Sequence, residues 1–563
     1  MRTYVHVFLS LMGGGLMTLA WPATGSIASL AFVGFVPFLL VVEDRWGLGN
    51  KPWRRGVAWV LLPGLFLWNM ITTTWLGNVE EAWPTRFLTG FLVMLANSAL
   101  MLLPFAFMRP VRRTFGALPG WFAFVDAWLC FEHLHMDWDL TWPWLTLGNV
   151  FATEPQWVQW YEYTGHLGGS LWVLLVNLSM LGLLVPRAWS FGTPWMAIAC
   201  LLVPLSVSLW RYHSYAPQGH EVQVVVVQPN IDPYSEKFLS ADPIEQLDRM
   251  LALAEPLMTE AVKVVVMPET ALQERPQVDI DRDGAVSVAG LWEGRMDRSR
   301  SVSRIKEWLR AYPNATVLTG MSAYKLYDKT DDYPVSARPL RGTDRHFDAS
   351  NSALFVNELG EVGVYRKSKL VAGVELLPFE EFLGSIEALS IDLGGTTGSL
   401  AIQEERSVFT AVDGSVRVAP VICYESVFGA YVGGYVRNGA GLIAVLTNDG
   451  WWGDTPGYKQ HKEYARLRAI EHRRDVLRSA NTGISCVIDQ RGDVSQATGW
   501  WEPAAFLATV RINSELTFFS RHGQYLGYLA LLASFLCLMA VLVARWMGTI
   551  GRYHGPARTE AES

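Results

Sequence analysis

The chain has 563 residues, of which half are hydrophobic, only 18% are charged and 25 are tryptophan. Together with a positive mean hydropathy, this composition is typical of a membrane protein that carries a sizeable water-soluble part. The formal net charge of −7, without a dense Lys/Arg patch among aromatic residues, argues against nucleic acid as a partner.

Eight apolar stretches approach the roughly 20 residues that a helix needs to cross a bilayer. Seven of them precede residue 212, and the eighth follows a long polar interval. We interpret the first as a retained signal anchor, because further spans follow it. The stretches are residues 5–21, 25–43, 56–77, 87–108, 116–132, 169–186, 192–210 and 524–547.

The orientation follows from Lys and Arg in the short connections, since these residues prefer the cytoplasm. With the N-terminus inside, the outer connections carry Arg86 and almost no other positive charge. An odd number of spans then places residues 212–520 outside the cytoplasm and both termini inside. The inside residues are Arg2, Arg45, Lys51, Arg54, Arg55, Arg109, Arg112, Arg113, Arg187, Arg545, Arg552 and Arg558.

We therefore predict three parts: a membrane domain over residues 1–211, a catalytic domain over 212–520, and a helix with a cytoplasmic tail over 521–563. Within the first part, segment 133–168 has no Lys or Arg and is rich in Trp and Tyr, the residues of a membrane–water interface. We expect this segment to form an interfacial, lid-like element under the soluble domain. Its His133 and His135 lack a nearby ligand cluster, so no metal site is predicted.

The soluble part alternates strands with helices, a pattern that favours an α/β sandwich. Short hairpins, such as the turn at 357–360, argue against a purely parallel sheet. The expected strands are residues 222–227, 262–267, 316–320, 353–356, 362–366, 416–422, 442–447, 484–489 and 505–510, and the expected helices are 242–257, 305–311 and 459–479.

Three of these strands are followed by a side chain capable of catalysis. Glu269 is either an exposed strand-end charge or a general base. Lys367 and Lys369 follow another strand and share one face if that strand continues. Cys423 is a candidate nucleophile, although a buried structural cysteine and a Cys423–Cys486 disulfide are alternatives.

Glu, Lys and Cys suit one reaction chemistry. A carboxylate takes the proton of a thiol nucleophile, and an ammonium stabilises the oxyanion of the tetrahedral intermediate together with a backbone N–H. Because the three residues are far apart in the sequence, spacing alone does not show that they meet.

Four motifs in order resemble the nitrilase superfamily: Pro-Glu-Thr at 268–270, Tyr-x-Lys-x-x-Leu-Val at 365–371, Ile-Cys-Tyr-Glu at 422–425 and Thr-Asn-Asp-Gly-Trp-Trp-Gly at 447–453. With the flanking spans, the chain is similar to the membrane-bound branch, the apolipoprotein N-acyltransferase family. Segments 460–483 and 517–523 match that family too. The resemblance implies an αββα sandwich attached to a helical membrane domain of about eight spans.

The resemblance also implies roles for single residues: Glu269 as base, Lys367 as oxyanion stabiliser and Cys423 as nucleophile, without cofactor or metal. A backbone donor after the cysteine falls at Tyr424. The loop before Glu375 departs from the family, since Ala372, Gly373 and Val374 replace Pro-Phe-Gly. The expected supporting residues are Glu375, Asn448 and Trp451, with Tyr424 and Glu425 near the substrate entrance.

The implied reaction is a ping-pong acyl transfer at the bacterial inner membrane. Cys423 takes an acyl chain from a phospholipid as a thioester and passes it to the α-amine of the diacylated N-terminal cysteine of an apolipoprotein. A membrane-tethered amidase acting on a small substrate is an alternative with the same triad. A scaffold or transporter is weighed less, on the expectation that no charged residue lies deep in the spans.

Overall fold

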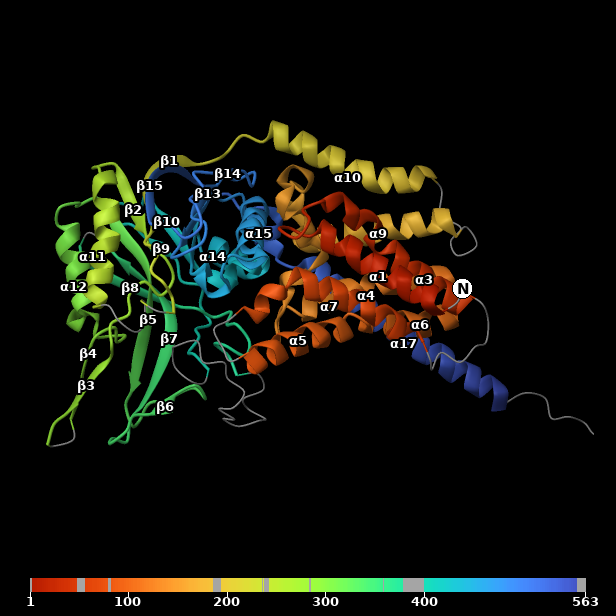
Figure 1. Cartoon of the computed structure of the whole chain (residues 1–563), viewed down its shortest axis with the longest axis horizontal. Coiled ribbons are helices and arrows are strands. Elements are labelled where there is room, and N and C mark those ends of the chain that lie inside the picture. Colours follow the sequence, from red (N-terminus) through yellow and green to blue (C-terminus); the bar gives the residue numbers. More distant parts are fainter. Residues whose placement is uncertain are drawn as a thin grey trace, which may run out of the picture.

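The computed structural model describes residues 3–47, 56–78, 83–185, 194–234, 236, 242–282, 285–357, 359–377 and 399–553. It has two parts along its long axis: a bundle of helices and a pair of stacked β-sheets (Figure 1). Some residues that were used to predict the orientation of the spans, and one residue of the predicted turn at 357–360, lie outside the described residues. They are Arg2, Lys51, Arg54, Arg55, Arg187 and Arg558, and Glu358 of the turn.

Helices occupy the eight predicted apolar stretches wherever the chain is described. They are α1 (Thr3–Ala20), α2 (Ala31–Gly34), α3 (Val36–Gly47), α4 (Val57–Thr72), α5 (Trp83–Leu100), α6 (Leu103–Phe115), α7 (Ala117–Leu134), α9 (His166–Leu184), α10 (Pro194–Ser214) and α17 (Tyr525–Tyr553). Five helical segments of the described chain are long and apolar enough to cross a membrane: Thr3–Ala20, Gly90–Phe115, His166–Leu184, Pro194–Ser214 and Tyr525–Met547. These helices fit a membrane domain, while the number of eight spans stays a prediction.

Two of the predicted spans are interrupted. Stretch 25–43 breaks between α2 and α3, where Asn177 Oδ1 accepts the backbone N–H groups of Phe35 at 2.9 Å and Val36 at 3.1 Å. The side chain of a neighbouring helix thus replaces hydrogen bonds that a continuous helix would make for itself. Stretch 87–108 breaks before Pro104, whose ring fits the first turn of a new helix.

One expectation about the spans is wrong. Asp126 lies in the middle of α7 and is half-buried, so a carboxyl group does occur deep within a predicted span. Asp126 therefore removes the reason for weighing a transporter less.

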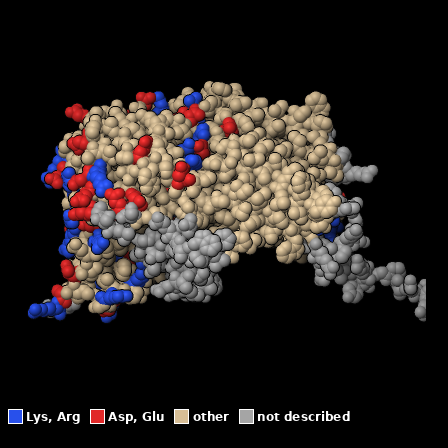
Figure 2. Space-filling model, in the orientation of Figure 1, with Lys and Arg blue, Asp and Glu red and all other residues tan. Residues whose placement is uncertain are grey.

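The surface separates the two parts. Charged side chains gather over the sheets, whereas the visible face of the helical part is almost free of them (Figure 2). On α10, the exposed Trp195 and Trp210 are separated by about 22 Å along the helix axis, at a rise of 1.5 Å per residue. The exposed Tyr528 and Trp546 mark two levels along α17 in the same way. This is the pattern of a lipid-facing belt bounded by interfacial aromatic residues.

Two large β-sheets form the sandwich of the soluble part, and β3 (Gln277–Ile280) and β4 (Val286–Ala289) pair as a separate two-stranded sheet. Within the described residues the first follows the order β15 (Ala504–Ile512), β1 (His220–Gln228), β2 (Val262–Val266), β5 (Thr316–Tyr327), β7 (His346–Val356) and β6 (Arg338–Pro339), and β8 (Val362–Arg366) pairs with β7. The second follows β14 (Val494–Ser495), β13 (Cys486–Ile488), β12 (Val476–Ala480), β11 (Leu442–Thr447), β10 (Arg417–Ile422) and β9 (Phe409–Thr410).

The run of valines in β1 explains the layers. Val224 and Val226 pack in the core between the sheets, while Val225 and Val227 face an outer core under α11 (Pro243–Ala254) and α12 (Arg300–Leu309). Because both faces are covered, the four valines at 224–227 follow one another without a polar residue. Helices α14 (Gly429–Arg437) and α15 (Pro456–His472) cover the second sheet, and the predicted αββα sandwich is confirmed.

The predicted helix over residues 459–479 is too long. Helix α15 ends at His472, and Arg473 takes the left-handed conformation with φ +50°. The chain then reverses into β12, which lies between β11 and β13. Polar Arg478 and Ser479 in this strand hid its central position, because a buried strand is expected to be apolar.

Candidate active site

Three strand ends bring the predicted catalytic residues together. Glu269 follows β2, Lys367 follows β8 and Cys423 follows β10 directly. All three side chains are buried. The turn at Glu269 passes so close to β5 that a Cβ on Gly320 would lie 2.6 Å from the Glu269 Cα, which explains the glycine there.

Lys367 lies between two carboxylates. Its Nζ donates to Glu375 Oε1 at 2.8 Å and to Glu269 Oε1 at 3.2 Å. The other oxygen of Glu375 accepts the N–H of Val371 at 3.0 Å. The loop therefore folds back so that Glu375 reaches Lys367, despite the departure at residues 372–374.

Burial and neighbouring charges set the protonation of the site. Burial lowers the pKa of Lys367, but Glu375, Glu269 and Cys423 together raise it well above the ordinary value, so the ammonium persists. Burial and the charge of Glu269 raise the pKa of Cys423, against the lowering effect of Lys367. At neutral pH the site thus holds a thiol, and a base is needed to take its proton.

The turn that carries Cys423 is strained and firmly held. Cys423 has φ +48°, a left-handed conformation that is uncommon outside glycine and frequent at functional sites. Its carbonyl accepts Ser426 Oγ at 2.7 Å and lies 3.1 Å from His461 Nε2. His461 Nδ1 lies 3.0 Å from Arg478, which can only donate, and 3.2 Å from Asp449 Oδ1, which can only accept, so this imidazole links the turn to a buried ion pair.

Glu425 lies in the interior and not at a substrate entrance. Its carboxylate is fully buried and accepts the backbone N–H groups of Ser368 at 2.7 Å and Ile422 at 2.8 Å. It thereby joins the turns that follow β8 and β10. Three phenol groups complete its partners: Tyr365, Tyr431 and Tyr435.

The other expected supporting residues surround this centre. The backbone N–H of Asn448 donates to Glu269 Oε2 at 3.0 Å, and Asn448 is fully buried. The Tyr424 hydroxyl donates to the carbonyl of Thr141 at 2.9 Å, in segment 133–168. The ring of Trp451 packs edge-on against Tyr234.

Sequence reasoning assigned no role to Asn351, His461 or Arg468. Asn351 bridges Glu269 and Glu375 from the middle of β7, where nothing in the local pattern marks it. Arg468 Nη1 donates to the carbonyls of Ser426 and Val427 just after Cys423. His461 and Arg468 could have been found from the sequence, because they are polar residues on the buried face of α15.

Cys423 and Cys486 are both free thiols, so the disulfide alternative is wrong. Likewise, His133 and His135 have separate partners: His133 Nδ1 is 2.7 Å from Gln524 Oε1, and His135 Nε2 is 3.1 Å from Asn97 Oδ1. These contacts join helices to one another, which is a structural role.

Helix α15 lies against the membrane part. Gln460 Oε1 accepts the indole N–H groups of Trp75 at 3.1 Å and Trp144 at 2.7 Å, and its amide nitrogen donates to backbone of the same part. Segment 133–168 is therefore packed against α15, with Trp144 almost completely buried.

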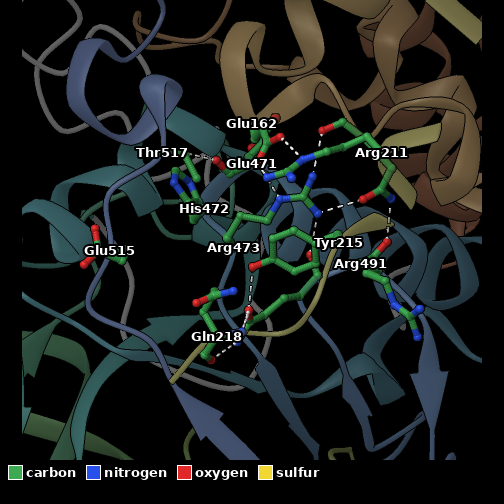
Figure 3. A network of polar contacts seen from close by, with 12 residues as sticks. Glu162, Arg211, Tyr215, Gln218, Glu471, His472, Arg473, Arg491, Glu515 and Thr517 are labelled. Atoms are coloured by element: carbon green, nitrogen blue, oxygen red, sulfur yellow. Dashed lines mark hydrogen bonds and ion pairs between the residues drawn. The ribbon is translucent and has the colours of Figure 1, made fainter. Parts of the chain in front are cut away.

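A buried ionic network also joins the catalytic part to the helical part, and we call this contact between the two parts the seam. Arg473 Nε donates to Glu162 Oε2 at 2.7 Å, and its guanidinium lies 4.3 Å from the ring centre of Tyr215 (Figure 3). Arg211, at the end of α10, binds the same carboxylate. Residues of the catalytic part, of segment 133–168 and of the last N-terminal helix thus meet at one point.

Comparisons with known proteins cover nearly the whole chain. The apolipoprotein N-acyltransferase N-terminal domain matches residues 13–179, and carbon-nitrogen hydrolase matches residues 223–517. An apolipoprotein N-acyltransferase of Chlorobaculum tepidum is 30% identical over 96% of this chain and 97% of its own length. One of Geobacter metallireducens is 26% identical over 92% of each chain. The solved structure of Saccharomyces cerevisiae Nit3, of the nitrilase superfamily, is 16% identical over 55% of this chain and 95% of its own, with a TM-score of 0.37.

Proposed function

The chain belongs to the apolipoprotein N-acyltransferase family, and on this premise we propose that Glu269, Lys367 and Cys423 carry out its acyl transfer. The observation that supports this assignment is the contact of Lys367 Nζ with Glu269 at 3.2 Å, inside a buried site whose electrostatics include Cys423. Three residues that follow separate strands are thus close enough for Glu269 and Cys423 to affect the pKa of Lys367.

In the first half-reaction, Glu269 takes the proton of the Cys423 thiol while the sulfur attacks the ester carbonyl of a phospholipid. The negative charge that develops on the carbonyl oxygen is stabilised by the Lys367 ammonium and the backbone N–H of Tyr424. When the intermediate collapses, the C–O bond breaks, and the leaving lysophospholipid oxygen takes the proton from Glu269. The enzyme then carries a thioester.

In the second half-reaction, a primary amine attacks the thioester carbon and passes a proton to Glu269. The C–S bond breaks, and the sulfur of Cys423 recovers the proton. The acceptor in this proposal is the α-amine of a diacylated N-terminal cysteine of an apolipoprotein. Acyl chains are costly to lift into water, which favours a site at the bilayer surface. The contacts of Gln460 with Trp75 and Trp144, which join the catalytic domain to the helical part, support this location.

The proposed location is the bacterial inner membrane, with the catalytic domain on the periplasmic side and both termini in the cytoplasm. The N-terminus lies at the end of the helical part far from the sheets, and α17 runs away from the sheets in the same direction (Figure 1), which supports this orientation. A reporter fused after Ser563 is expected to behave as cytoplasmic. A periplasmic signal from that fusion would contradict the orientation.

Trapping the acyl-enzyme tests the chemistry. Membranes with the wild-type protein are incubated with phospholipid labelled in its acyl chain, and the thioester is located by mass spectrometry. We expect label on Cys423 in the wild type and in Cys486→Ala, which removes a buried thiol of β13, but none in Cys423→Ala. Label that persists in Cys423→Ala would remove Cys423 as the nucleophile.

A further inference from the structure

Asn351 bridges the two carboxylates of the site. Its Nδ2 donates to Glu269 Oε1 at 2.8 Å and to Glu375 Oε1 at 3.1 Å. The backbone carbonyl of Asn351 also accepts the N–H of Lys367 at 2.8 Å. The residue is 7% exposed and lies in the middle of β7.

These contacts fix the direction of the amide. Carboxylates only accept hydrogen bonds, so the NH2 group faces them and Oδ1 points elsewhere. Within the part of the chain that the structure describes, Oδ1 is buried and has no hydrogen-bond partner. A buried acceptor left unpaired costs about 1–3 kcal/mol, so this oxygen would gain from a donor that the substrate brings.

The two half-reactions differ in what they offer to such an atom. A phospholipid ester presents oxygen acceptors to the site, and these suit a donor such as Asn448 Nδ2, a buried amide atom without a partner among the described residues, in a residue whose backbone N–H donates to Glu269. Oδ1 of Asn351 is an acceptor and needs an N–H or O–H group. The attacking amine of the second half-reaction brings two N–H bonds.

We propose that Asn351 Oδ1 binds the acceptor amine during transfer: one N–H bond points to Glu269, the second to Oδ1, and the lone pair to the thioester carbon. The proposal rests on the proposed function and deepens it, because it makes Asn351 a catalytic residue of aminolysis. The proton still passes from the amine nitrogen to Glu269 and then to the sulfur of Cys423. Oδ1 holds its N–H without taking the proton.

The test compares two nucleophiles on the same acyl-enzyme. Full-length Asn351→Ala is first acylated with labelled phospholipid. The rate of acyl transfer from Cys423 is then measured with a short peptide that carries a diacylated N-terminal cysteine and, separately, with a small thiol. A thiol has a single S–H bond, so Oδ1 offers it no second contact. Losing the bridge between the carboxylates affects both transfers and cancels in their ratio.

We expect the ratio of amine to thiol transfer to fall about 10- to 100-fold in Asn351→Ala, with the same direction in Asn351→Ser if the alanine variant does not fold. Ser350→Ala, on the opposite face of β7, should keep the wild-type ratio. An unchanged ratio in a folded Asn351 variant would overturn the inference. If the wild type itself forms no acyl-enzyme, the proposed function fails instead, which is a separate result.

Discussion

Lys367 Nζ is closer to Glu375 Oε1, at 2.8 Å, than to the carboxylate assigned as the base. Glu375 thus makes the closer ion pair with Lys367, while Glu269 is the carboxylate assigned to take the thiol proton. In Glu375→Gln the ammonium would pair with Glu269 alone and make it a weaker base. We expect the rate of acylation to fall about 10- to 100-fold, measured as thioester formation in a single turnover.

The control for this effect is Glu375→Asp, which keeps the charge on a shorter side chain and should recover part of the rate. A Glu375→Gln enzyme that acylates at the wild-type rate would show that the pairing is without consequence for the base.

Glu425 stabilises the site from behind, and its loss should affect folding as well as rate. Five donors point at one buried carboxylate, two of them from the turns beside Lys367 and Cys423. In Glu425→Gln, an NH2 group would face some of these donors. We expect a loss of about 2–4 kcal/mol in unfolding free energy and a large loss of acylation.

A residue at a substrate entrance would behave differently, since its change would raise KM for phospholipid with little loss of stability. Thermal unfolding in detergent, together with KM, separates the two cases. Tyr435→Phe, which removes the most distant donor at 3.2 Å, should cost clearly less than Glu425→Gln.

The sequence predicted the residues of the candidate site where buried strands end abruptly at a reactive side chain, as at Glu269, Lys367 and Cys423, and their catalytic roles stay a proposal. It failed where a polar residue is itself buried. Arg478 is fully buried in β12 against Asp449, and this pair made a central strand look like the end of a helix. Asn351 carries no local signal, because its role arises from two carboxylates that the fold brings to it from other segments.

The Arg473–Glu162 pair should be the strongest single contact of the seam between the two parts. Both side chains are about 95% buried, whereas the second partner of Glu162, Arg211, is 32% exposed. Arg473→Leu leaves Glu162 with the partly exposed Arg211 alone and removes the donor of buried oxygens of Gln159 and Gln490, so it is expected to cost about 3–5 kcal/mol. Arg211→Leu should cost about 1 kcal/mol or less.

The measurement is thermal unfolding of the purified full-length protein in detergent for both variants. Equal shifts in Tm would show that the two arginines contribute alike and that burial does not decide their effect.

Asp475 makes stability depend on pH in an unusual direction. Burial raises its pKa to about 6, although the backbone N–H of Arg511 donates to it at 2.7 Å. Below the unfolded value of 3.8 the carboxyl group is neutral in both states and costs nothing. As pH rises from 3.8 towards 6, Asp475 ionises in the unfolded chain while it stays mostly neutral in the folded protein. This difference favours the unfolded chain and lowers the free energy of unfolding by about 2–3 kcal/mol at neutral pH.

Asp475→Asn removes this cost while its side-chain oxygen still accepts the N–H of Arg511. We expect the variant to unfold a few degrees higher than the wild type at pH 7.5, and the difference to vanish near pH 4. The comparison is made by thermal unfolding of both proteins across that range. A gain of equal size at both pH values would assign the effect to altered packing, because a titrating carboxylate gives a difference only where the folded and unfolded states bind different numbers of protons.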